Sequence, residues 1–120
     1  MSDELRLTMQ MTLINGNLRK SIQPVLSAID QADDLAFEDV NPIATSEESI
    51  SSFGSVANEG YCFLQNLDET NYIEIGFSTG VYGIKLKAGE ASILRLVPGL
   101  TLYLRANTAT CNLYLVVLED

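Results

Sequence analysis

Six short apolar segments decide the fold: YCFLQNL (61–67), NYIEIGF (71–77), YGIKLK (82–87), SILRLV (92–97), LTLYLRA (100–106) and TCNLYLVVL (110–118). Turn residues separate them, as in Asp68-Glu69-Thr70 and Pro98-Gly99. Within most of these segments apolar and polar residues alternate, which is the pattern of a strand with one buried face. Strands spaced about 8 to 12 residues apart are typical of an antiparallel sandwich or barrel. The last segment is apolar on both faces for half its length, which predicts a central strand or a covered outer face.

The N-terminal region predicts further strands. Apolar residues alternate with polar ones from Leu5 to Leu13, which predicts one strand over this range. Asn15-Gly16-Asn17 supplies the residues of a tight turn, and residues 18–22 are expected to return antiparallel. A further short strand is expected over residues 25–29, and Pro24 restricts this chain segment to the edge or end of a sheet.

The acidic middle of the chain is the least regular part. Residues 29–40 (IDQADDLAFEDV) lack a clear period and are expected to form a loop with a weak strand or a single helical turn, followed by a weak strand over residues 40–45. Taken together, the segments predict an all-β protein. We expect an antiparallel β-sandwich, jelly-roll-like, of about eight to ten short strands that forms a single domain over residues 1–120, with an open barrel as the alternative.

Charge and composition restrict the partners. The chain of 120 residues holds 16 acidic and seven basic side chains, for a net charge of −9. Half of the acids lie between residues 30 and 59, where no Lys or Arg occurs. This argues against nucleic acid and against anionic membrane lipid as partners. It favours a solvated acidic face, or an acidic face that meets a basic partner. No apolar run reaches the roughly 20 residues of a membrane-spanning helix, and MSDELRLTMQ does not resemble a secretory signal, so we expect folding in a cytoplasm.

The chain has few residues of the types that catalysis requires. Histidine is absent, so the commonest general base and zinc ligand is missing, and we expect no enzyme activity, no cofactor and no zinc site. Calcium remains an alternative to a solvated loop in the acidic segment, although the calcium-loop pattern is missing. Its candidate ligands there are Asp30, Asp33, Asp34, Glu38 and Asp39. Cys62 and Cys111 lie inside apolar strands as small hydrophobes, and whether they pair is left open by the sequence.

Two groups of side chains are candidate interface residues. Arg6, Thr8, Gln10 and Thr12 share one face of the first strand, which is polar but carries a single charge. Tyr103 and Tyr114 fall on the faces of their strands that also carry Arg105 and Asn112, respectively. Tyr and Arg are enriched at the energetic centres of protein interfaces, so an interface is favoured there over a sugar-stacking surface.

Several motifs resemble those of a family of small, mostly uncharacterised structural proteins of tailed bacteriophages, of the capsid-decoration kind. They are the alternating N-terminal strand with its Asn-Gly-Asn-Leu turn, a Ser-Glu-Glu element (46–48), Gly60-Tyr61-Cys62-Phe63, NLDETNYIEIG (66–76), KLKAGE (85–90) and the terminal ANTA…LED. The similarity covers most of the chain and is weakest in residues 30–44. It implies a virion component made in the host cytoplasm, with the major capsid protein or other virion proteins as partners.

The resemblance therefore favours a capsid decoration (cement) protein that binds major capsid subunits as a homo-oligomer and stabilises the head. A head–tail connector or tail component is the alternative within the virion. A lectin-like module that binds a host glycan is the alternative from another class.

Overall fold

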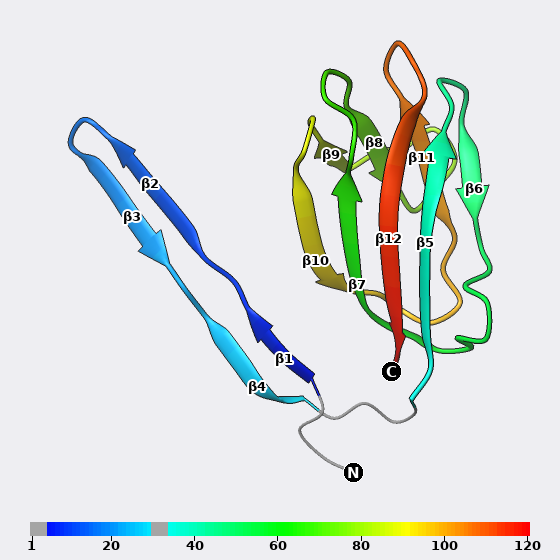
Figure 1. The fold of residues 1–120 in the computed structure, drawn as a ribbon, viewed down its shortest axis with the longest axis horizontal. Coiled ribbons are helices and arrows are strands. Elements are labelled where there is room, and N and C mark those ends of the chain that lie inside the picture. The colour runs from blue at the N-terminus through cyan, green and yellow to red at the C-terminus, as the bar shows by residue number, and fades with distance from the viewer. Residues whose placement is uncertain (1–4, 30–33) are drawn as a thin grey trace. The chain divides into compact units, whose positions relative to one another are not determined.

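The computed structural model describes residues 5–29 and 34–120, and in these ranges the protein is all-β (Figure 1). It contains twelve strands and no helix there, so no described helix could cross a membrane. Contacts divide the chain into two compact units, Met1–Ala32 and Asp33–Asp120. We call the described part of the first unit the arm and that of the second the sandwich. Every strand of the two large sheets belongs to the second unit, and the single domain expected over residues 1–120 stays a prediction.

The arm is a long ribbon of two antiparallel chain segments, each of which is divided into two strands. The four strands are β1 (Leu5–Thr8), β2 (Met11–Asn15), β3 (Leu18–Ile22) and β4 (Val25–Ile29). β2 pairs with β3 and β1 pairs with β4, both antiparallel. A hydrogen bond of 3.2 Å from Met9 N to Pro24 O lies between the two pairs. The tight turn is confirmed: Gly16 has φ +57°, the left-handed backbone that a two-residue hairpin loop requires.

The expectation of one continuous strand over residues 5–13 is wrong. The ladder is interrupted between β1 and β2, opposite the gap between β3 and β4 that contains Pro24. Proline has no backbone N–H to donate to a ladder, so an interruption at this position follows from its chemistry. The break accounts for part of the difference between the eight to ten strands expected and the twelve observed.

The second unit holds two four-stranded antiparallel sheets. The first sheet has the order β10-β7-β12-β5 and the second β6-β11-β8-β9. The strands of the first sheet are β5 (Ala36–Ile43), β7 (Glu59–Asn66), β10 (Ala91–Arg95) and β12 (Cys111–Glu119). Those of the second are β6 (Glu48–Ile50), β8 (Ile73–Gly76), β9 (Ile84–Leu86) and β11 (Leu102–Ala106). The two sheets lie face to face in a sandwich-like arrangement (Figure 1).

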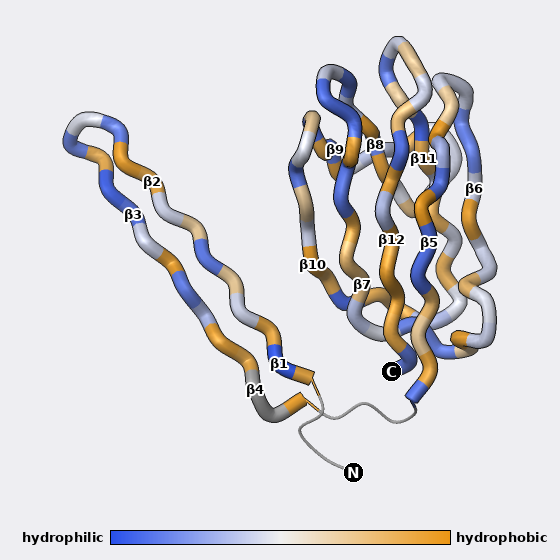
Figure 2. Tube along the Cα trace, viewed as in Figure 1, coloured by the Kyte–Doolittle hydropathy of each residue, from blue (hydrophilic) through white to orange (hydrophobic). Residues whose placement is uncertain are grey.

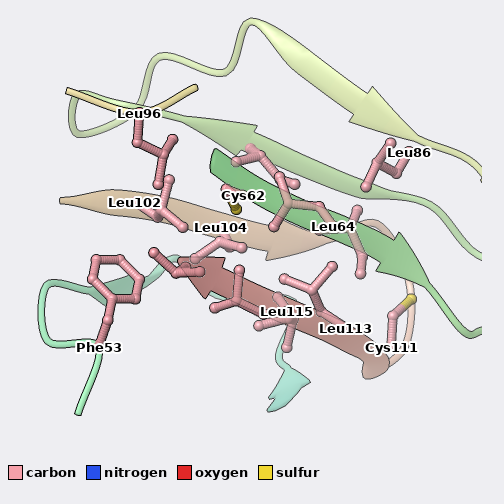
Figure 3. Close-up of a cluster of buried hydrophobic side chains, with 14 of the residues drawn as sticks. Phe53, Cys62, Leu64, Leu86, Leu96, Leu102, Leu104, Cys111, Leu113 and Leu115 are labelled. Carbon is pink, nitrogen blue, oxygen red and sulfur yellow. The ribbon is translucent and has the colours of Figure 1, made fainter. Parts of the chain in front are cut away.

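The core lies between these sheets and is built from alternate residues of their strands. In β12, Leu113, Leu115 and Val117 are fully buried, whereas the residues between them are half-buried on the outer face. Figure 3 shows the side chains of Leu113 and Leu115 in the same cluster as Leu64 of β7 and Leu104 of β11. The prediction of a central position for the last strand is confirmed, since β12 lies between β7 and β5.

A strand runs through residues 36–43, where the sequence predicted a loop with a weak strand or a helical turn up to residue 40 and a weak strand over residues 40–45. β5 pairs with β12 over its whole length, from Ala36 opposite Leu118 to Ile43 opposite Cys111. It is one of the two edge strands of the first sheet, and its outer face is open to solvent. Acidic residues are tolerated at such a position because their carboxylates stay hydrated, and charge on an edge strand discourages further pairing. Partnership with β12, rather than local propensity, therefore determines this strand.

A buried asparagine organises the loops at one end of the sandwich. Asn66 is fully buried, and its amide nitrogen donates to Asn71 O (2.8 Å) and to Leu86 O (3.0 Å). Its side-chain oxygen accepts a hydrogen bond of 3.0 Å from the backbone N–H of Asp68. One side chain thus connects the end of β7 to the loop that follows it and to β9 in the other sheet.

We expect Asn66→Ala to lower the free energy of unfolding by about 2–4 kcal/mol, because three buried or half-buried backbone groups would lose their partner. Urea denaturation followed by circular dichroism measures this change. Asn112→Ala is the matched control, since Asn112 lies exposed on β12 and its loss should cost less than about 0.5 kcal/mol. Equal effects of the two substitutions would contradict the organising role of Asn66.

Candidate interaction surfaces

The arm exposes an unusual amount of apolar side chain for its size. Of the twelve large hydrophobic residues that are exposed in the described chain, seven lie in the arm, among them Ile14 (65% exposed) and Met11 (61%). Figure 2 shows hydrophobic residues along both of its strands. An isolated two-stranded ribbon is marginally stable in water at best, because it has no second layer to bury such residues. The arm therefore has the composition of a surface that another layer covers.

The β2–β3 part of the arm has two distinct faces. Cross-strand partners share a face, so the register places Met11 with Ile22, Leu13 with Lys20 and Asn15 with Leu18 on one face. We call the apolar set Met11, Leu13, Leu18 and Ile22 the arm's apolar face. The opposite face carries the pairs Thr12–Ser21 and Ile14–Arg19.

The polar residues proposed from the sequence lie on this arm and are exposed, as expected for a contact surface. They are Arg6, Thr8, Gln10 and Thr12. The Gln10 amide lies 3.5 Å from the Thr12 hydroxyl, and Thr8 is paired with Val25 across the ribbon. Because apolar residues alternate with them along the same strand, the apolar face is the larger energetic contributor to any contact that the arm makes.

The structure separates Tyr103 and Arg105 from Tyr114. Tyr103 and Arg105 lie on β11 in the second sheet, and Tyr114 lies on β12 in the first. Each points away from the core, since the neighbouring Leu102, Leu104, Leu113 and Leu115 are buried. The three residues thus belong to two opposite outer faces of the sandwich, and they do not form one interface.

On the second sheet, Arg105 is the centre of a polar cluster. Its Nε atom lies 3.0 Å from Glu74 Oε1, and its guanidinium lies 4.4 Å from the centre of the Tyr82 ring. The Tyr82 hydroxyl donates a 2.5 Å hydrogen bond to Glu47, which also accepts one of 2.7 Å from Gly80 N. These bonds hold the pKa of Glu47 below its ordinary value and raise the pKa of Tyr82.

The sequence did not identify Glu47, Glu74 and Lys85 as members of this face. Glu74 pairs with Arg105 on one side and with Lys85 on the other, and the Lys85 ammonium lies 4.2 Å above the Tyr72 ring. Alternation within each strand indicates which residues point outward. The contacts among them depend on strand order and register, which a single sequence does not contain.

The outer face of the first sheet is largely apolar and aromatic. Tyr114 packs edge to face against Phe63 with ring centres 5.8 Å apart. Val116 lies between Phe63 and Glu38, and Tyr114 lies beside Val40, which is 48% exposed. The Tyr114 hydroxyl donates a hydrogen bond to the Glu38 carboxylate, which raises the pKa of Tyr114. This face thus combines an apolar centre with an acidic border at β5.

Two hollows on the sandwich differ in their lining. One, of about 320 Å³, is lined by the apolar residues Phe77, Leu94, Leu96, Val97 and Leu100 together with Arg95. The other, of about 360 Å³, is lined by Gln65, Asn66, Leu67, Asp68, Glu69, Ala88 and Gly89. In the second hollow, Asn66 and Asp68 are engaged in hydrogen bonds to the backbone. Neither hollow combines an aromatic ring with free polar groups, as a sugar site requires.

The acidic residues do not converge in the part of the chain that can be described. Asp30 and Asp33, two of the calcium candidates, lie outside it. Glu38 and Asp39 are neighbours in β5 and therefore point to opposite sides of the sheet. The Asp39 carboxylate accepts a hydrogen bond of 2.9 Å from Val40 N. Across residues 5–29 and 34–120, no group of three or more Asp, Glu or Cys side chains is placed to hold a metal ion.

The two cysteines are free thiols inside the sandwich (Figure 3). Cys62 lies on β7, and burial raises the pKa of its thiol to about 12. Cys111, on β12, also has its pKa raised by burial. A thiol with such a pKa is protonated at neutral pH, which suits a packing role rather than nucleophilic chemistry.

Comparisons with protein-family models, with curated proteins and with solved structures find no match to this chain. Its function is therefore argued from these surfaces and from the sequence motifs.

The Glu47 cluster predicts a pH dependence. A carboxylate whose pKa is lowered by folding stabilises the native state above its unfolded value of about 4.5, and this contribution is lost as the pH falls through the folded pKa. We expect the wild-type protein to melt at a higher temperature than Glu47→Gln at neutral pH, and the difference to shrink between about pH 5 and pH 3. Thermal denaturation across this range measures it.

Glu69→Gln is the control for this comparison, because it removes one exposed negative charge from the loop between β7 and β8. A difference between wild type and Glu47→Gln that stays constant down to pH 3 would show that the bonds from Tyr82 and Gly80 do not depend on the ionised carboxylate.

Proposed function

We propose that this protein is a structural component of a tailed-bacteriophage virion, a capsid decoration (cement) protein that binds major capsid subunits and stabilises the head. The observation that carries the proposal is the arm, which presents seven exposed large apolar residues on a ribbon with no second layer of its own. Such a surface is suited to burial against another protein chain. The resemblance of the sequence motifs to phage structural proteins supplies the virion context.

The strand order of the sandwich supports this proposal. We assign its eight strands to a jelly roll, because the first sheet has the order β10-β7-β12-β5 and the second β6-β11-β8-β9. Successive strands pass from one sheet to the other at every step except β8 to β9. The jelly roll is common in viral capsid and lectin domains. The fold is therefore compatible with both a capsid decoration protein and a lectin-like module, and the choice between them depends on the side chains at the surface.

The surfaces favour assembly over glycan binding. Three tyrosine rings that could stack on a sugar each have a cation over one face. The pairs are Lys85 over Tyr72, Arg95 over Tyr61 and Arg105 over Tyr82, at 4.2 to 4.4 Å from the ring centre. An occupied ring face is not available for a sugar. A flat outer face built from aromatic and apolar residues is better suited to a protein contact.

The proposed partners are the major capsid protein or other virion proteins, in a homo-oligomer placed on symmetric sites of the particle. The protein would be made in the host cytoplasm and would reside in the virion. No cofactor or chemical step enters this role. Its contribution is contact area and rigidity, supplied by the packed sandwich and the arm.

Quantitative mass spectrometry of purified particles tests the proposal. A decoration protein should be present in on the order of hundreds of copies per particle, and the purified protein should bind preformed capsids that lack it. A head–tail connector would instead be present in about six or twelve copies. Absence from particles would contradict any virion role.

The lectin-like alternative is tested in parallel with Tyr103→Ala. If the protein binds a glycan through this face, the substitution should abolish a signal on a glycan array while leaving particle binding intact. We expect no array signal from the wild-type protein and unchanged particle association of the variant.

A further inference from the structure

We propose that the arm of one copy of this protein packs its apolar face on the outer face of the first sheet in a second copy, with Lys20, the basic residue on that face of the arm, against Glu38 at the acidic β5 edge. The inference deepens the proposed homo-oligomer, on which it rests, by naming the two surfaces that form it. It concerns only copies of this chain, so it can be tested without a particle.

Charge distinguishes the arm from the sandwich. The arm, residues 5–29, contains Arg6, Arg19 and Lys20 and no acidic residue, for a net charge of +3. Residues 34–120 contain four basic and twelve acidic side chains, for a net charge of −8. An arm against another arm would bring two positive surfaces together, whereas an arm against a sandwich pairs opposite charges. The complementary surface for the arm is therefore present in every copy of the protein.

The apolar residues on the outer faces of the two sheets also indicate which face accepts the arm. The outer face of the first sheet presents Phe63, Tyr114 and Val116 at its centre and the half-exposed Val40 at its edge. Glu38 lies on the same face, beside Val40 in β5. In contrast, the outer face of the second sheet is occupied by the ion pair and the cation–ring contacts around Arg105. Of the two outer sheet faces, that of the first sheet therefore combines apolar side chains with an acidic edge, as the arm requires.

The contact is expected to be face to face rather than edge to edge. β5 is an edge strand of its sheet, but Pro42 lacks a backbone N–H and Val40 N is bonded to the Asp39 carboxylate. Proline and charge at an edge both discourage the addition of another strand. Two β layers pack with about 10 Å between their backbones, which the side chains of both faces would fill.

The two surfaces predict a closed oligomer. A specific interface buries roughly 800 Å² on each partner, which sets the extent of the contact that the arm must make. Because each copy has both an arm and an acceptor face, exchange between copies can satisfy every arm in a closed symmetric oligomer.

Sedimentation equilibrium of the full-length chain over about 1 to 100 µM provides the test. We expect the wild-type protein to self-associate and Leu13→Asp to weaken this association at least about a hundredfold, because a charged group would replace a buried leucine. Thr12→Asp is the matched control. It adds the same charge one residue away, on the opposite face of the ribbon, and should change the dissociation constant by less than about threefold.

The acceptor face is tested in the same assay with Val40→Asp, which should weaken association, and with Val81→Asp, which should not. Val81 is similarly exposed but lies between β8 and β9 of the second sheet. A reciprocal charge exchange then tests the pairing. Lys20→Glu should weaken association about threefold to tenfold, and Glu38→Lys in the same chain should restore it.

Three results would overturn the inference. A wild-type protein that is monomeric throughout the range would show that the arm is not covered by a second copy. Equal effects of Leu13→Asp and Thr12→Asp would show that the apolar face is not the contact. Loss of association with Leu13→Asp but not with Val40→Asp would show that the arm does not contact the outer face of the first sheet.

These results are independent of the proposed virion role. Binding of the monomeric wild-type protein to preformed capsids would leave the decoration role standing while this inference failed. Conversely, self-association with the expected variant pattern but no particle binding would leave the inference standing without that role.

Discussion

A β layer with one apolar face is stable only where a second layer covers that face, and this constraint governs the whole structure. In the sandwich, the two sheets cover each other's apolar faces. β12 lies at the centre of the first sheet and turns Leu113, Leu115 and Val117 towards the second sheet, where Leu102 and Leu104 of β11 are equally buried. Neither sheet would keep its strand order without the other sheet, because its apolar residues would then face water.

The arm does not meet the same constraint by itself. Its ribbon has a regular hairpin turn and a continuous register through β2 and β3, yet the side chains of Met11 and Ile14 remain more than half exposed. Within the residues described, the protein thus contains one complete layered structure and one incomplete one. The proposed assembly role would supply the missing cover for this incomplete layer. The absence of acidic residues from residues 5–29, in a chain of net charge −9, indicates what kind of surface completes it.

The sequence predicted those parts of the fold that depend on local pattern. Alternation identified most strands of residues 61–118, and Asn15-Gly16-Asn17 identified the hairpin turn, because strand period and positive φ are properties of a few neighbouring residues. β5 was predicted only in part, as a weak strand over residues 40–45, because its stability comes from β12, which lies about seventy residues away in the chain. The break in the N-terminal strand was missed because its cause, Pro24, lies on the opposite strand.

The same distinction applies to the candidate surfaces. The exposure of Arg6, Thr8, Gln10 and Thr12 follows from alternation and was predicted. That Tyr103 and Tyr114 lie on different sheets follows from strand order, which alternation does not contain. The sequence also drew attention to the polar face of the arm, whereas the register and exposure of both strands show the apolar face to be the more distinctive feature. Its basic character becomes informative only once residues 5–29 are known to form a unit of their own.

Hydrogen–deuterium exchange of the arm amides at two protein concentrations tests the central claim most directly. If a second copy covers the arm, the amides of residues 5–29 should exchange rapidly in dilute solution and become protected as the concentration rises, while those of β7 and β12 stay protected throughout. Arm amides whose exchange does not change with concentration, whether fast or slow, would contradict the account.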